Sequence, residues 1–144
     1  MKGLKTWLLM VGGFYILLGI GFFPPINEAR LPFMLPIDVL PETVAYKAVI
    51  DWTFTFGLDL LVIGGYLVYA SREPLKHINL VWLVIWLEAI RGVANDIYYI
   101  FRGYASVPFY IGFIVVHVII IATGLRVARQ GRAVAAQTRS QGGG

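Results

Sequence analysis

The sequence predicts an all-α membrane protein, built as an antiparallel bundle of four transmembrane helices. The chain of 144 residues is 58% hydrophobic and only 14% charged, whereas soluble domains carry roughly 25% charged residues. Four stretches are long and apolar enough for the roughly 20 residues that a helix needs to cross a bilayer core of about 30 Å. Because these apolar runs are continuous and do not alternate with polar residues, they favour helices over the strands of a membrane barrel.

The four helices follow from the positions of these runs and of the residues that interrupt them. The first is expected at residues 6–23, because its apolar run stops at Pro24 and Pro25. The other three are expected at residues 47–70, 78–101 and 109–125.

The connections between the helices differ in length. Residues 71–77 and 103–108 are short turns, so each joins antiparallel neighbours. The segment 24–45 is longer and holds five of the seven prolines together with many apolar residues. We expect an interfacial Pro-rich loop here, which either anchors the chain at the membrane surface or covers the mouth of the bundle as a lid.

Basic residues orient the bundle. Eight of them flank the termini or lie in the 71–77 turn, and three lie on the other side. The positive-inside rule then places both termini in the cytoplasm, so we expect a multi-pass membrane protein with both ends on that side. Residues 1–132 are expected to form one domain, and residues 133–144 a disordered cytoplasmic tail. The basic excess requires no nucleic acid as a partner, since the lipid bilayer accounts for it.

Ionisable residues at membrane depth are the most informative feature of the second and fourth helices. Each costs roughly 2.5 to 3.5 kcal/mol at a helix centre, so such residues usually have a function. Asp51, Thr55 and Asp59 are spaced four residues apart and therefore share one helical face. His117 lies close to the middle of the fourth helix.

The third helix carries a second set of polar residues. Glu88, Arg91, Asn95 and Tyr98 are spaced so that they lie along one face, and Asp96 lies at its flank. The halves of the helices nearer the cytoplasm are apolar by contrast. This distribution predicts a polar pocket that opens to the outer face of the membrane.

The candidate ligand-binding residues of this pocket are Asp51, Asp59, Glu88, Arg91, Asn95, Asp96, Tyr98 and His117. Arg91 is expected to pair with Glu88 on its own helix or with Asp59 across the bundle. Such a pair serves as a structural clamp, as a ligand contact or as part of a proton relay. His117 is either a hydrogen-bonded interhelical histidine or a catalytic or ligand-contacting one.

The sequence also excludes several kinds of chemistry. Without cysteine, the chain has no disulfide, thiolate nucleophile or Cys-ligated metal. It lacks the motifs of a phosphate loop, a nucleophile elbow, a zinc protease and a dinucleotide site. We therefore expect no metal and no cofactor.

Three functions are compatible with the pocket. The first is non-enzymatic binding of a small amphipathic, aromatic or lipidic ligand, or of a membrane-complex partner, with Arg91 holding a carboxylate or phenolate. The second is an isomerase-like enzyme in which Asp59 or Glu88 acts with His117 as an acid/base pair. The third is a subunit of a proton-coupled transporter.

Four stretches resemble the BphX-like family of small bacterial four-span membrane proteins. They are NEARLPFMLP after the first helix, DWTFTFGLDLLVIGGYLV in the second, LVWLVIWLEAIRGVANDIYYIFRGY in the third and FYIGFIVVHVIIIATG in the fourth. The resemblance covers residues 10–128. It implies a place in the bacterial inner (plasma) membrane and an association with the bacterial catabolism of aromatic compounds, without an established activity and without functional residues to carry over.

Overall fold

The regular structure of the chain is helical throughout the residues that the computed structural model describes, which are 2–34, 40–103 and 107–141. The helices are α1 (Lys2–Ile20), α2 (Pro24–Met34), α3 (Val44–Ala70), α4 (Ile78–Leu87), the π-helix η1 (Glu88–Ala94), α5 (Asn95–Phe101) and α6 (Val107–Gln141). Four helical stretches are long and apolar enough to cross a membrane: Lys2–Ile20, Val44–Ala70, Ile78–Phe101 and Val107–Val134. The predicted all-α class and the four apolar helices are thus confirmed.

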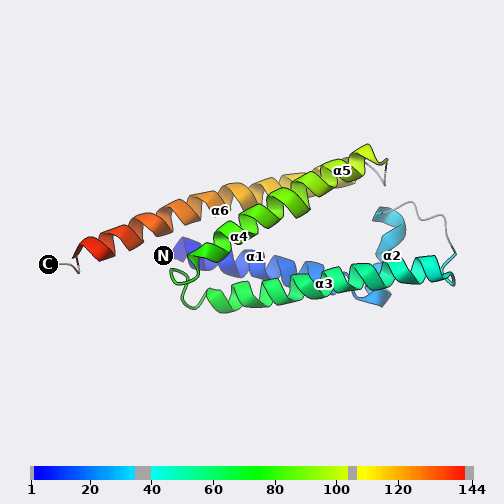
Figure 1. Cartoon of the computed structure of the whole chain (residues 1–144), viewed down its shortest axis with the longest axis horizontal. Helices are drawn as coiled ribbons and strands as arrows, with labels where there is room; N and C mark the ends of the chain where they lie inside the picture. Colours follow the sequence, from blue (N-terminus) through cyan, green and yellow to red (C-terminus); the bar gives the residue numbers. More distant parts are fainter. Residues whose placement is uncertain (1, 35–39, 104–106, 142–144) are drawn as a thin grey trace.

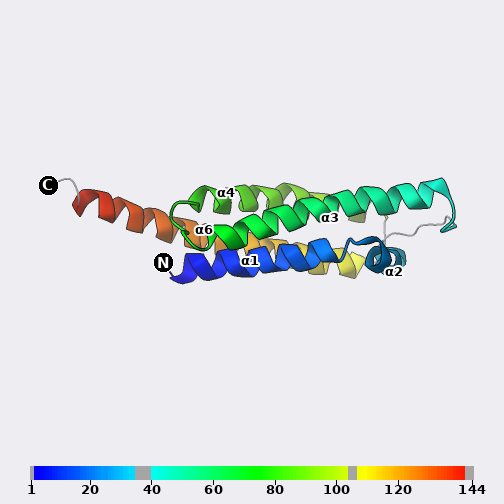
Figure 2. The ribbon, with the colours of Figure 1, turned by 90° about the horizontal axis from the view of Figure 1, so that it is seen from below.

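The long helices form two pairs (Figures 1 and 2). α1 packs along α3, and the continuous rod α4–η1–α5 packs along α6. Both termini lie at the same end of the molecule, together with the turn between α3 and α4. In Figure 1 the two pairs diverge toward the opposite end, where α2 lies.

Glycines let α1 and α3 pack backbone against backbone. A Cβ atom on Gly12 would lie 2.9 Å from the carbonyl oxygen of Gly64, and one on Gly19 would lie 2.7 Å from that of Gly57. Real Cβ atoms do not approach backbone so closely, so larger residues at these positions would push the helices apart. The glycines therefore fix which side of α3 faces the rest of the bundle.

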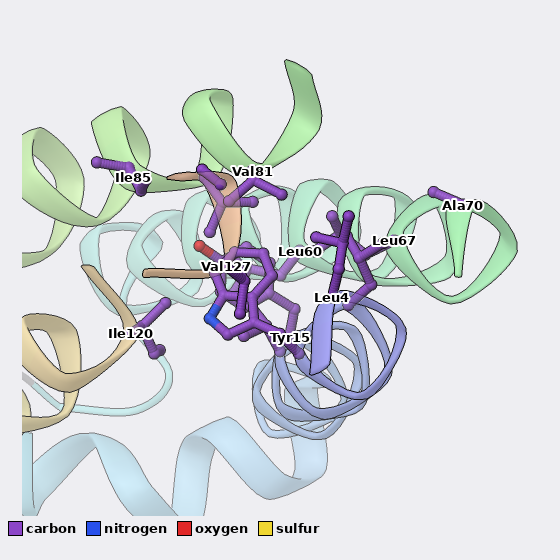
Figure 3. Packing of buried hydrophobic residues seen from close by; sticks show 14 of the residues in the cluster. Leu4, Tyr15, Leu60, Leu67, Ala70, Val81, Ile85, Ile120 and Val127 are labelled. Carbon is purple, nitrogen blue, oxygen red and sulfur yellow. The ribbon is translucent and has the colours of Figure 1, made fainter. Parts of the chain in front are cut away.

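The apolar core fills the space between the helix pairs (Figure 3). Its most deeply buried side chains include those of Leu8, Leu67, Val81, Val84 and Ala128. One hydrogen bond crosses between α1 and α6 near this core, from Nε1 of Trp7 to Oγ1 of Thr123 at 3.0 Å. This packing holds the pairs together at the end that carries the termini.

The Pro-rich segment after the first helix differs from the prediction. Its residues 24–34 form helix α2 and are not a loop. Pro24 and Pro25 occupy the first turn, where a missing backbone N–H breaks no helical hydrogen bond. Thr43 then caps α3 by accepting a hydrogen bond from the backbone N–H of Tyr46 at 3.2 Å. Residues 35–39, the centre of the predicted loop or lid, lie outside the described residues.

The last helix also extends beyond its predicted end. We expected it to stop at residue 125 and a disordered tail to begin at residue 133, whereas α6 continues to Gln141. Residues 142–144 lie outside the described part of the chain.

Candidate functional site

A cavity of about 600 Å³ lies where the two helix pairs diverge. Seven of its lining residues are aromatic: Phe22, Trp52, Phe56, Tyr99, Phe109, Tyr110 and Phe113. Seven others are polar or charged: Asn27, Arg30, Thr53, Arg91, Asn95, Asp96 and His117. A concave, largely apolar space of a few hundred Å³ with a few polar groups is typical of small-molecule sites.

A row of four polar side chains leads from this cavity into the bundle, and each comes from a different helix. We call Tyr15, Glu88, His117 and Asp96 the buried polar row. Glu88 is only 3% exposed. The hydroxyl of Tyr15 donates a hydrogen bond to Oε1 of Glu88, and Nδ1 of His117 lies 2.5 Å from Oε2 of Glu88. On the other side of the imidazole, Nε2 lies 3.4 Å from Oδ2 of Asp96.

The row joins two spaces. His117 and Asp96 line the large cavity, whereas Tyr15 and Glu88 line a smaller one of about 50 Å³. His117 and Arg91 border both. Because each ring nitrogen of His117 faces a carboxyl group, the imidazole can take a proton on one side and release it on the other. The arrangement can therefore hold or pass a proton between the cavity and Glu88.

The π-helix η1 explains how Glu88 and Asp96 come to face the same histidine. In an α-helix, residues eight positions apart point about 80° away from each other. A π turn takes up one extra residue, so Asp96 occupies the direction of the seventh residue after Glu88, only about 20° away. The sequence analysis placed Asp96 at the flank of the polar face because it treated the whole third helix as a regular α-helix.

Gly92 in η1 makes room for the imidazole ring. A Cβ atom built there would lie 2.5 Å from Cγ and Nδ1 of His117. The ring therefore packs directly on the backbone of η1, which sets its position beside Glu88. Sequence reasoning missed this residue. The available signal was a single glycine within the third apolar run, four residues after Glu88.

Arg91 does not form the ion pair that we expected. In the described part of the chain it pairs with neither Glu88 nor Asp59. Its guanidinium instead lies over the ring of Phe56, 4.5 Å from the ring centre. Arg91 thus lines the cavity as a cation without a carboxylate partner among these residues.

Helix α2 supplies a second cation that the sequence analysis missed, because this segment was taken as a loop. The guanidinium of Arg30 lies over Phe22, 4.1 Å from the ring centre. Its Nη2 donates to Oδ1 of Asn27 at 3.3 Å, and Nδ2 of Asn27 donates to Oγ1 of Thr53 at 2.6 Å. Asn27 is fully buried, and burial lowers the pKa of Arg30. The available signal was an Asn and an Arg three residues apart within an apolar segment.

The structure does not bring all the predicted site residues together. Arg91, Asn95, Asp96 and His117 line the large cavity, and Glu88 lies directly behind it. Asp51, Asp59 and Tyr98 are exposed and do not line either cavity. The face of α3 that carries Asp51 and Asp59 therefore points away from the site. Among the described residues, no group of three or more His, Asp or Glu side chains could hold a metal ion.

Fold and site together define a small all-helical protein with four helices suited to crossing a membrane and an aromatic cavity at one end. The chain belongs to the BphX-like family, whose pattern it matches over residues 1–133. It is 27% identical over 130 residues to an uncharacterised BphX-like protein of Burkholderia cepacia and, to the same extent, to one of Paraburkholderia xenovorans strain LB400. Each alignment covers 90% of this chain and 93% of the relative. No solved structure matches the chain.

Proposed function

We propose that this chain is a multi-pass protein of the bacterial inner membrane that binds a small anionic amphipathic ligand, with an aromatic or lipidic body, in the large cavity. One observation carries the proposal. Arg30 and Arg91 line an aromatic cavity, and neither has a carboxylate partner among the described residues. Arg30 is partly buried, and a cation in apolar surroundings is costly without a counter-charge, which a ligand anion would supply.

The aromatic walls support the same class of ligand. Phe22 and Phe56 contact each other edge to face, with ring centres 5.0 Å apart, and each carries one guanidinium on its face. A ligand ring or acyl chain in this space would be removed from water, which contributes about 25 cal/mol per Å² of buried apolar surface. The guanidiniums would then fix its charged end.

Basic residues support the proposed orientation in the membrane. The C-terminal part of α6, which carries Arg126, Arg129 and Arg132, lies toward the end of the molecule that carries the start of α1. The positive-inside rule favours the cytoplasm for this end. The lining residues belong to the opposite end, beside α2, so in this orientation the cavity would lie toward the outer face.

Calorimetric titration of the purified protein in detergent micelles tests the binding. The probes are benzoate, octanoate and uncharged benzyl alcohol, so that an aromatic body is compared with a lipidic one, and the aromatic body with and without charge. We expect an anion to bind, and Arg91→Gln and Arg30→Gln each to weaken its binding about tenfold. The exposed Arg126→Gln serves as the matched control. Failure of both anions to bind, or an equal loss in the control, would overturn the proposal.

The contact of 2.5 Å between His117 and Glu88 favours one alternative, an isomerase-like enzyme that uses this pair for acid/base catalysis. Asp59 has no part in it, because its exposed side chain lies away from the cavity. Turnover of a bound unsaturated acid, lost in both Glu88→Gln and His117→Gln, would support an enzyme. A proton-coupled transporter would use the same pair and would instead give flux driven by a pH gradient in proteoliposomes.

A further inference from the structure

Asp96 presents a buried carboxylate oxygen that makes no hydrogen bond in the described structure. Its side chain lines the large cavity, and the residue is only 8% exposed. Its Oδ2 atom is buried and makes no hydrogen bond, and its contact with Nε2 of His117, at 3.4 Å, is an ion pair only when the imidazole is protonated. A buried acceptor without a donor is costly. A hydroxyl or N–H group of a ligand would satisfy it.

Arg30 presents the complementary feature, a hydrogen-bond donor without an acceptor. Its Nε atom is buried and has no hydrogen-bond partner, while Nη2 is already used by Asn27. The guanidinium face is covered by Phe22, so the remaining donors lie at the edge of the group. A carboxylate is the group that fits such an edge, since its two oxygens can accept two parallel N–H bonds.

The two unsatisfied groups belong to different sides of the cavity. Arg30 lies on α2, which packs on α3, and Asp96 lies on α5, which packs on α6. Aromatic rings line the space: Phe22 meets Phe56 at 5.0 Å on the first side, and Tyr99 meets Tyr110 at 5.6 Å on the second. A cavity of this composition suits a flat ring with one polar group at each end.

We propose that the cavity takes a hydroxyaryl carboxylic acid in one orientation, with its carboxylate on Arg30 and its hydroxyl donating to Asp96. This assignment rests on the proposed function and adds to it the class of ligand and its direction. The reverse orientation would set the ligand carboxylate against the Asp96 carboxylate, and the two like charges would repel each other in a site of low dielectric constant. Arg91 borders both cavities but is exposed, whereas Arg30 is partly buried and has a buried donor without a partner, so Arg30 is the residue that gives the ligand its direction.

The test compares 3-(4-hydroxyphenyl)propanoate and 4-hydroxybenzoate with the same acids lacking the hydroxyl and with their methyl esters. Calorimetry in micelles gives each dissociation constant. In the unmodified protein, we expect the hydroxyl and the carboxylate of the better-fitting acid each to improve binding about tenfold or more, the range for hydrogen bonds to charged groups. Asp96→Leu should remove the advantage of the hydroxyl only, and Arg30→Gln that of the carboxylate only.

Two controls keep the test decisive. Asp59→Asn removes an exposed carboxylate on α3 and should leave every affinity unchanged. The acids lacking the hydroxyl report whether Asp96→Leu still folds, and Asp96→Asn, which keeps the shape of the side chain, should retain part of the hydroxyl advantage. If these acids bind but the hydroxyl brings no advantage, or if Asp96→Leu leaves that advantage intact, the direction is wrong and the proposed function stands. If no aryl acid binds, this assignment fails, and the proposed function fails with it only if octanoate does not bind either.

Discussion

Two sets of acidic residues occupy similar positions in their helices but have opposite surroundings. In the buried polar row, Glu88 is enclosed and contacts Tyr15 and His117 with its two oxygens. On α3, Asp59 is exposed and has no ion-pair partner in the described part of the chain. The same helical spacing predicted both sets to line one pocket. Spacing identifies residues that share a face, but it does not determine whether that face points inward.

The packing glycines decide the orientation of α3. Gly57 and Gly64, with the buried Leu60 and Leu67, mark the side that packs against the rest of the bundle. At about 100° per residue, the face of Asp51 and Asp59 points about 160° away from that side. Substitutions in the two sets of acidic residues should therefore lower the free energy of unfolding to very different extents.

The largest effect is expected from Glu88→Leu. It would leave the Tyr15 hydroxyl and Nδ1 of His117 buried without their shared acceptor. Breaking a buried charged pair typically costs about 3–5 kcal/mol. Reversible unfolding in mixed detergent micelles measures this cost as a fall in the free energy of unfolding. A loss below about 1 kcal/mol, as for an ordinary surface residue, would show that Glu88 is not enclosed in this way.

A smaller effect is expected from Gly92→Ala. The added methyl group would lie 2.5 Å from the His117 ring and must displace it or η1. Overpacking of this kind costs about 1–3 kcal/mol. The His117 ring signals in an NMR spectrum should shift along with the loss of stability. Gly112→Ala on α6 is the control, because a Cβ atom there meets nothing within 4 Å; a similar loss in both variants would contradict the assignment.

The smallest effect is expected from Asp59→Asn. With no partner to lose, this variant should change the free energy of unfolding by no more than about 0.5 kcal/mol, as is usual for exposed positions. The same unfolding assay applies. Clear destabilisation would contradict the contrast between the two acidic sets.

The fold was more predictable than the site, and α2 shows why. A long apolar run by itself indicates a membrane-spanning helix, because every residue of such a helix must tolerate lipid. Residues 24–34 are short and contain three prolines, so composition suggested a loop. Proline disfavours the middle of a helix but not its first turn, where Pro24 and Pro25 lie. Missing this helix meant missing Asn27 and Arg30, which lie on it and line the cavity.

The π-helix has a consequence for how such a site can arise. One additional residue in η1 rotates the whole of α5 by about 100° relative to α4, and so changes the direction of Asn95, Asp96 and Tyr99 together. A point mutation alters one side chain, whereas a single inserted codon reorients an entire helical segment. An ancestral protein with an unbroken third helix could thus have acquired one wall of the cavity in one genetic step. Deleting one residue between positions 88 and 94 would reverse that step.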